Sequence, residues 1–145
     1  MSVRLALVPA ALIAVALTGC TQAAKNDSTS NKFTGDQKQI AKVVDDLQKQ
    51  TESKNGAKIC ANLITAELQQ KIAQTAGAKG CGPAVKQAIK ESDQSDLTVR
   101  TVTIDASDPA KATAVVKQKT NKNASRDTTL QFEKQGSTWR ISSLG

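Results

Sequence analysis

The spacing of the apolar residues changes once along the chain, and this change constrains the fold more than any other sequence feature. From Asp36 to Asp96 the apolar residues recur every three or four positions, which is the pattern of amphipathic helices. After Asp96 they alternate with polar residues, which is the pattern of strands with one buried face. A helical half followed by strands favours an α+β fold, in which N-terminal helices pack on one face of a sheet.

Four helical segments are predicted before the change. The first begins at about Asp36 and ends near Gly56, and the second carries Cys60 on its apolar face. Thr65 is expected to cap the third, because its hydroxyl can accept a hydrogen bond from a first-turn N–H. Pro83 is expected at the first position of the fourth, just after Cys81. The residues expected on the buried faces are Ile40, Val43, Val44, Leu47, Ile59, Leu63, Ile64, Leu68, Ile72, Val85, Ala88 and Ile89.

Four strands are predicted after the change, joined as an antiparallel meander. They are expected at residues 97–105, 112–119, 128–132 and 139–141. The alternation of the first strand shifts phase near Arg100 and Thr101, which indicates either a bulge or a strand that is partly buried on both faces. Residues 134–137 are predicted to form a four-residue hairpin loop between the last two strands.

The N-terminus has the organisation of a secretory leader. Arg4 supplies a positive charge, and residues 5–16 are apolar and uncharged. This stretch is too short to remain as a membrane span, which takes about 20 apolar residues. Residues 17–20 (Leu-Thr-Gly-Cys) resemble a bacterial lipobox. The resemblance implies that the signal peptide, residues 1–19, is removed and that acyl chains on Cys20 anchor the protein at the extracytoplasmic face of the cell membrane. The alternative is an ordinary signal peptide followed by a chance cysteine.

The remainder of the chain is predicted to be a tether and one domain. Residues 20–35 are polar, with no apolar periodicity, and are expected to be flexible. Residues 36–145 are enough for a single domain. With Cys20 acylated, Cys60 and Cys81 form an even pair in an oxidising compartment, so we predict one disulfide. A redox or metal pair is the alternative, but the chain has no C-x-x-C motif and no histidine.

The formal charge of the chain is +7, and part of it lies in one acid-free run. This basic run consists of Lys111, Lys117, Lys119, Lys122 and Arg126. It is a candidate site for anionic lipids or acidic envelope polymers. The alternative is a solvated strand face that lysines keep soluble. Nucleic acid is not an expected partner, since a chain with no Tyr, two Phe and one Trp lacks platforms for stacking bases.

The order of elements, together with Cys60, Cys81 and the closing Trp-Arg-Ile at 139–141, resembles a group of small lipoproteins from high-GC Gram-positive bacteria. In that group a C-x-x-L-(x)-T segment, here residues 60–65, precedes a second Cys and a sheet that ends in a similar strand. Those domains resemble the cone-shaped nuclear-transport-factor-like or SnoaL-like fold and its cystatin-like relatives. The resemblance implies a fold and not a function, because that superfold includes isomerases, dehydratases and plain binding modules.

No catalytic signature follows the leader. The absence of His and Tyr removes the acid–base groups of the enzymes of that superfold, together with Ser–His and Cys–His nucleophiles and His-ligated metal sites. We therefore predict a non-catalytic protein without a metal or cofactor.

Three hypotheses for the function remain. The first is an interaction or adaptor module that binds envelope proteins or anionic lipids and polymers through the basic run. The second is a carrier of a small apolar ligand or lipid, and the third is an enzyme of the same superfold. A closed apolar pocket would favour the carrier, whereas a filled core with a one-sided basic patch would favour the adaptor. The residues that could line such a pocket, or simply fill the core, are Leu97, Val99, Val115, Leu130, Phe132, Trp139 and Ile141.

Overall fold

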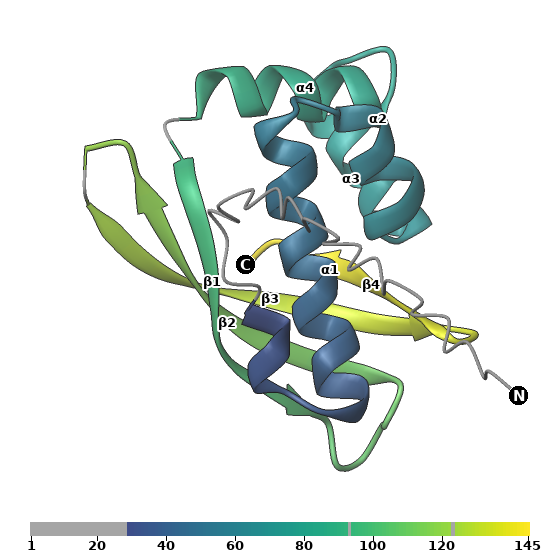
Figure 1. The fold of residues 1–145 in the computed structure, drawn as a ribbon. Coiled ribbons are helices and arrows are strands. Elements are labelled where there is room, and N and C mark those ends of the chain that lie inside the picture. Colours follow the sequence, from purple (N-terminus) through teal and green to yellow (C-terminus); the bar gives the residue numbers. More distant parts are fainter. Residues whose placement is uncertain (1–28, 93, 123) are drawn as a thin grey trace, which may run out of the picture.

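Helices precede strands in the computed structural model, as the change in apolar spacing predicts (Figure 1). The structure describes residues 29–145 except 93 and 123, so the predicted signal peptide, Cys20 and most of the predicted tether lie outside the described residues. The helical elements are η1 (Thr29–Lys32), α1 (Gly35–Glu52), α2 (Gly56–Lys58), the π-helical turn η2 (Ile59–Leu63), α3 (Ala66–Thr75) and α4 (Cys81–Glu91). The strands are β1 (Gln94–Ile104), β2 (Lys111–Thr120), β3 (Ser125–Gln135) and β4 (Thr138–Ser143).

The four strands form one antiparallel sheet in the order β1-β2-β3-β4, which confirms the predicted meander. The register of β1 shifts between Val99 and Thr101, which confirms the predicted bulge. The β3–β4 loop is shorter than predicted, because Gln135 pairs with Thr138 and leaves only two residues in the turn. Gly136 has a positive φ of 63° and can therefore make so tight a turn.

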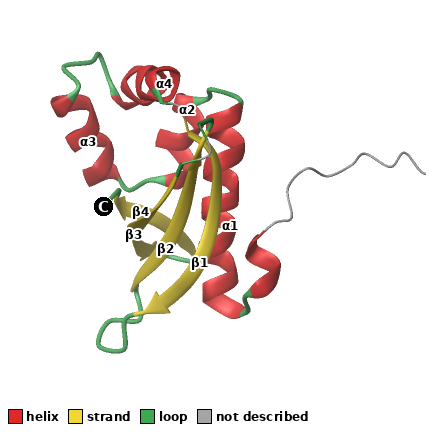
Figure 2. Ribbon diagram, turned by 90° about the vertical axis from the view of Figure 1, so that its left-hand side faces the viewer, coloured by secondary structure: helices red, strands yellow, loops and turns green. Residues whose placement is uncertain are grey.

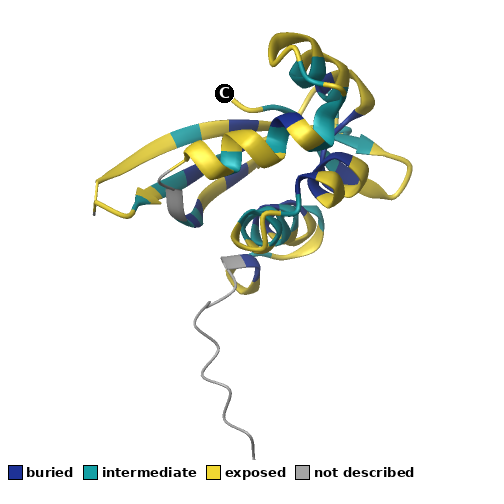
Figure 3. Cartoon of the chain, turned by 90° about the horizontal axis from the view of Figure 1, so that it is seen from above, coloured by how far each residue is buried: buried dark blue, intermediate teal, exposed yellow. Residues whose placement is uncertain are grey.

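The helices cover one face of the sheet, and the opposite face is exposed. Along the strands, buried and exposed residues alternate (Figure 3). The core lies between α1, whose Ile40 and Val44 are fully buried, and inner-face residues that include Trp139 and Ile141. On β2 the buried positions are Ala112, Ala114 and Val116. Val115 therefore lies on the opposite face of the sheet, and its predicted place in the apolar interior was wrong.

The folded part of the chain reaches back to Thr29, although residues 29–35 were predicted to belong to the flexible tether. Ser30 is only 7% exposed, and its backbone N–H donates a hydrogen bond to a carboxylate oxygen of Asp45 at 3.2 Å. Phe33 packs against the core. A single aromatic residue in a polar stretch has no periodicity, so the spacing of apolar residues could not reveal this contact.

Two predicted helix boundaries differ in the structure. Ile64 was expected on the second helix, but it leaves the helix and pairs in parallel with Ile141 of β4. Thr65 continues this pairing through its backbone N–H, and its Oγ1 accepts a hydrogen bond from the N–H of Leu68 at 3.3 Å, which confirms the predicted cap. Pro83 is the third residue of α4 and not the first, because α4 begins at Cys81.

Two glutamines of α1 bind the free edge of β1. Gln48 Oε1 accepts a hydrogen bond from the N–H of Leu97 at 2.7 Å, and Gln37 Nε2 donates one to the carbonyl of Val102 at 3.0 Å. Gln37 and Gln48 are about 16 Å apart along the helix. Their partners Leu97 and Val102 are also about 16 Å apart along the strand. This match fixes α1 alongside β1 and covers part of the sheet edge.

A second contact fixes the start of α1 on the β3–β4 hairpin. Lys134 Nζ donates to both carboxylate oxygens of Asp36, at 3.1 and 3.0 Å, and lies 5.6 Å from the centre of the Trp139 ring. The hydrogen bond from Lys134 is the main cause that lowers the pKa of Asp36 below its ordinary value. The indole N–H of Trp139 lowers the pKa further, although it has no hydrogen bond of good geometry within the described residues.

Helices α2 and α4 cross with their backbones in contact, at Gly56 and Gly82. A Cβ atom on Gly56 would overlap the carbonyl oxygen of Gly82 and would lie 2.8 Å from the backbone N of Lys86. A Cβ atom on Gly82 would meet Ala57 Cα at 3.3 Å, which a small shift can accommodate. Only glycine at residue 56 therefore allows this crossing.

We predict that Gly56→Ala lowers the free energy of unfolding by about 1–3 kcal/mol, because backbone atoms must move to admit the methyl group. Gly82→Ala is the matched control, since both changes gain the same helix propensity from alanine and differ in the space available. Urea unfolding followed by circular dichroism measures both variants. A Gly56→Ala protein at least as stable as the Gly82→Ala protein would contradict the close crossing.

Candidate ligand-binding site

An open cleft of about 750 Å³ lies between the helices and the inner face of the sheet. Its walls come from the C-terminal half of α1, from α3 and α4, and from residues at the end of the chain. Figure 2 shows α3 and α4 standing apart from the strands, on the side where the cleft is found.

None of the helices in the described part of the chain is long and apolar enough to cross a membrane.

The floor of the cleft is buried and apolar. It is made of side chains that are at most 5% exposed: Ile59, Ile64, Leu97, Val116 and Leu130. Two of the residues predicted to line an apolar hollow, Leu97 and Leu130, are in this floor. Both also belong to the packed core, together with Val99, Phe132, Trp139 and Ile141. These predicted residues therefore fill the core, and the cleft lies against its surface at Leu97 and Leu130.

The walls of the cleft keep apolar side chains partly in contact with solvent. Leu47, Ile72, Val85 and Ile89 are half-buried, and Leu144 is 47% exposed. The stripe of Val85, Ala88 and Ile89 on α4 was predicted to be buried, yet Ala88 is exposed and the other two are only partly covered. The spacing correctly placed these residues on one face of the helix, and Val85 and Ile89 pack against the core from one side, but the described part of the chain covers that face only in part.

A disulfide holds α4 in this position. Cys60 of η2 and Cys81, the first residue of α4, are bonded, with their Cα atoms 6.1 Å apart. This confirms the predicted pairing. Together with the crossing at Gly56 and Gly82, the disulfide fixes the start of α4 against α2 and η2. The apolar face of α4 is thereby kept at the wall of the cleft.

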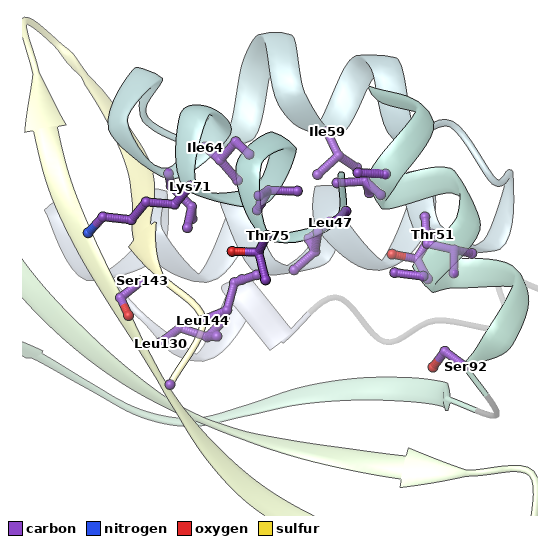
Figure 4. Close-up of a pocket in the computed structure, with 18 of the residues that line it drawn as sticks. Leu47, Thr51, Ile59, Ile64, Lys71, Thr75, Ser92, Leu130, Ser143 and Leu144 are labelled. Atoms are coloured by element: carbon purple, nitrogen blue, oxygen red, sulfur yellow. The ribbon is translucent and has the colours of Figure 1, made fainter. Parts of the chain in front are cut away.

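Polar side chains stand at the two ends of the cleft. Figure 4 shows Lys71 and Ser143 at one end and Thr51 and Ser92 at the other, with apolar side chains such as Leu47 between them. Lys71 is the only ionisable side chain among the described residues that line the cleft. Sequence reasoning missed Lys71 and Leu144. The sequence did hold a signal for Lys71. It lies three residues after Leu68 and four before Thr75, so these residues share one face of α3 and Lys71 could have been expected beside the apolar stripe.

Three lysines of the basic run, Lys111, Lys117 and Lys119, lie on the exposed face of β2 with carboxylates nearby. Lys111 pairs with Asp108 at 3.2 Å, and Lys117 lies opposite Asp127 of β3. Arg126 Nε donates to Gln118 Oε1 at 2.8 Å, which places Arg126 on the inner face.

Lys119 lies opposite Asp96 of β1, and Lys122 is in the β2–β3 turn. These five residues are acid-free in sequence, but neighbouring strands bring carboxylates from β1 and β3 beside them. Alternation along the strands keeps Lys111, Lys117 and Lys119 on one face and places Arg126, the partner of Gln118, on the other.

A second hollow of about 710 Å³, at the opposite end of the sheet, carries charged groups of both signs, Asp105, Lys111 and Glu133. Its carboxylate Asp105 accepts hydrogen bonds from the backbone N–H and the hydroxyl of Ser107, at 2.8 and 2.6 Å. The hydroxyl bond is the largest cause that lowers the pKa of Asp105. The carboxylate therefore closes a turn. Among the described residues there is no cluster of three or more His, Cys, Asp or Glu side chains that could hold a metal ion.

No protein-family model and no curated protein sequence matches this chain.

We predict that replacing both cysteines, as Cys60→Ala with Cys81→Ala, lowers the free energy of unfolding by about 3 kcal/mol. The loss follows because the unfolded chain is no longer constrained by the loop that the disulfide closes. Thermal unfolding measures the change, and the unaltered protein in reductant is the control that should unfold at the same lower temperature. A melting curve that neither change affects would show that the two cysteines are not paired.

Proposed function

We propose that this protein is a membrane-anchored extracytoplasmic lipoprotein whose domain binds the apolar part of a lipid or a similar small amphipathic molecule. The observation that carries the proposal is the apolar cleft between α3, α4 and the sheet. Its volume is within the range of about 300–1,000 Å³ that is usual for ligand sites. The anchor is the lipid predicted on Cys20.

The partly exposed apolar walls make binding of an alkyl chain favourable. Each CH₂ group that leaves water contributes about 0.8 kcal/mol, so about eight groups would contribute roughly 6 kcal/mol before the cost of ordering the chain. Leu144, Val85 and Ile89 would lose their contact with water in such a complex. The molecule would then cover the part of the apolar face of α4 that stays in contact with solvent.

The other two hypotheses have less support. An adaptor that acts through the basic run would need those residues on one surface, whereas Arg126 and Lys117 lie on different faces, and Lys111 is paired. A catalytic role would need more than one ionisable group at the cleft, and Lys71 is the only such side chain that the described residues contribute. The arrangement of helices over a four-stranded meander is compatible with a nuclear-transport-factor-like fold, which we keep as a proposal.

We predict that Ala88→Phe blocks the cleft. Ala88 is exposed and lines the cleft. Its neighbour Gln87 is also exposed but does not line the cleft, so Gln87→Phe is the matched control. The readout is the fluorescence of the uncharged dye N-phenyl-1-naphthylamine, titrated with the unacylated chain that begins at residue 20. We expect affinity about tenfold weaker for Ala88→Phe and unchanged for Gln87→Phe. Equal binding by both variants, or no binding by the unaltered chain, would contradict the proposed cleft function.

We predict that Cys20→Ala moves the protein from the membrane to the soluble fraction, because the site of acylation is lost. Fractionation of the cells and detection of the protein in each fraction test this. The variant with Cys60→Ala and Cys81→Ala is the control, since it loses cysteines but keeps the proposed anchor. If the Cys20→Ala protein stays at the membrane, a lipid on Cys20 is not what holds it there.

A further inference from the structure

The helical layer at residues 53–91 carries most of the net positive charge of the domain. It holds six lysines, all of them exposed, and two acidic residues, Glu67 and Glu91. Its net side-chain charge is therefore +4, compared with zero for residues 29–52 and +2 for residues 92–145. None of the six lysines forms an ion pair with a described residue. They are Lys54, Lys58, Lys71, Lys79, Lys86 and Lys90.

Carboxylates stand near three of these lysines. Lys54 and Lys90 share a hollow of about 310 Å³ with the carboxylates of Glu52 and Asp96. The lysine of α3 comes four residues after Glu67, a spacing at which side chains are neighbours on a helix. The charge of these three lysines is therefore partly balanced.

The other three lysines lie around the crossing of α2 and α4, and we call them the crossing lysines. Lys58 is the last residue of α2, and Lys79 belongs to the connection that leads into α4. The backbone of Lys86 packs on Gly56 at the start of α2. Figures 1 and 2 both show α2 and α4 at the same end of the molecule. The crossing lysines therefore share one end of the domain.

No acidic neighbour balances the charge at this crossing in the way seen for the other lysines. Glu91, the acidic residue of α4, comes five residues after Lys86 and so lies on a different side of the helix. Its carboxylate accepts a hydrogen bond from Gln87 at 3.0 Å. The crossing lysines do not line the cleft, so their charge is presented outside it.

We propose that this end of the molecule binds a membrane surface that contains anionic lipids, through the crossing lysines. A protein partner would have to present carboxylates matched to three separate elements, whereas an anionic bilayer attracts lysines wherever they meet its surface. Each lysine adds to this attraction, and its long flexible stem lets the ammonium group reach the headgroups. The inference goes beyond the proposed binding of a ligand in the cleft.

The proposed anchor makes even a weak attraction effective. A lipid on Cys20 would keep the domain close to the bilayer, so that contact through the lysines takes place at a high local concentration. The anchor alone would leave the domain free to turn on its tether. The crossing lysines would give it one orientation, with α2 and α4 toward the headgroups.

The experiment measures binding to vesicles without the anchor, using the unacylated chain that begins at residue 20. One set of vesicles is pure phosphatidylcholine, and the other also contains phosphatidylglycerol. Co-sedimentation at rising lipid concentration gives the affinity, at low and at high ionic strength. We expect binding at least about tenfold tighter to the anionic vesicles at low ionic strength, and loss of this preference in high salt.

Two matched pairs of substitutions test where the attraction arises. Lys58→Gln with Lys86→Gln should remove most of the preference for anionic vesicles, and Lys58→Arg with Lys86→Arg should keep it. Lys117→Gln with Lys119→Gln is the control, because it removes the same charge from the exposed face of β2 and should leave the preference unchanged. Titration with N-phenyl-1-naphthylamine checks that each variant keeps the cleft.

The outcomes separate this inference from the proposed function. Equal binding to both kinds of vesicle would overturn the membrane inference. A preference that survives Lys58→Gln with Lys86→Gln, or that the β2 control lowers as much, would also overturn it, since the attraction would then arise elsewhere. None of these results bears on the cleft, which the dye titration tests separately.

Discussion

The crossing of α2 and α4 determines where the apolar face of α4 points. Gly56 and Gly82 bring the two backbones into contact, and the Cys60–Cys81 disulfide closes the same junction. A short, covalently fixed junction holds the start of α4 against α2 and η2. The apolar side chains of α4 therefore face the open space between that helix and the strands, and this space is the cleft.

The rest of the domain provides a rigid base for this arrangement. Helix α1 is tied to the edge of β1 by Gln37 and Gln48, and to the β3–β4 hairpin by the ion pair of Asp36 with Lys134. Beneath α1 the core is filled by large side chains such as Trp139. A firm core beside an incompletely covered helical layer is the combination that a binding site for an apolar molecule requires, since the site must keep its shape while it exchanges water for ligand.

The sequence predicted the fold class, the meander, the bulge in β1 and the disulfide, because these depend on local spacing and on cysteine count. It could not predict which apolar stripe is covered: the stripes of α1 and α4 look alike in sequence, yet Val44 is fully buried and Ala88 is exposed. The surroundings of the basic run could not be predicted for a similar reason, since Asp127 becomes a neighbour of Lys117 only when β3 pairs with β2. The close approach at Gly56 was missed because a glycine after a helix predicts only a helix end.

The central claim is that the cleft carries a lipid-like molecule, and native mass spectrometry of the full chain extracted from its own membranes in mild detergent tests it most directly. We expect a reproducible non-covalent mass, in the range of a lipid or a similar small amphipathic molecule, that is lost when the protein is denatured while any acyl chains on Cys20 remain. The same mass under native and denaturing conditions would contradict the claim, because the extracted protein would then carry no molecule in its cleft.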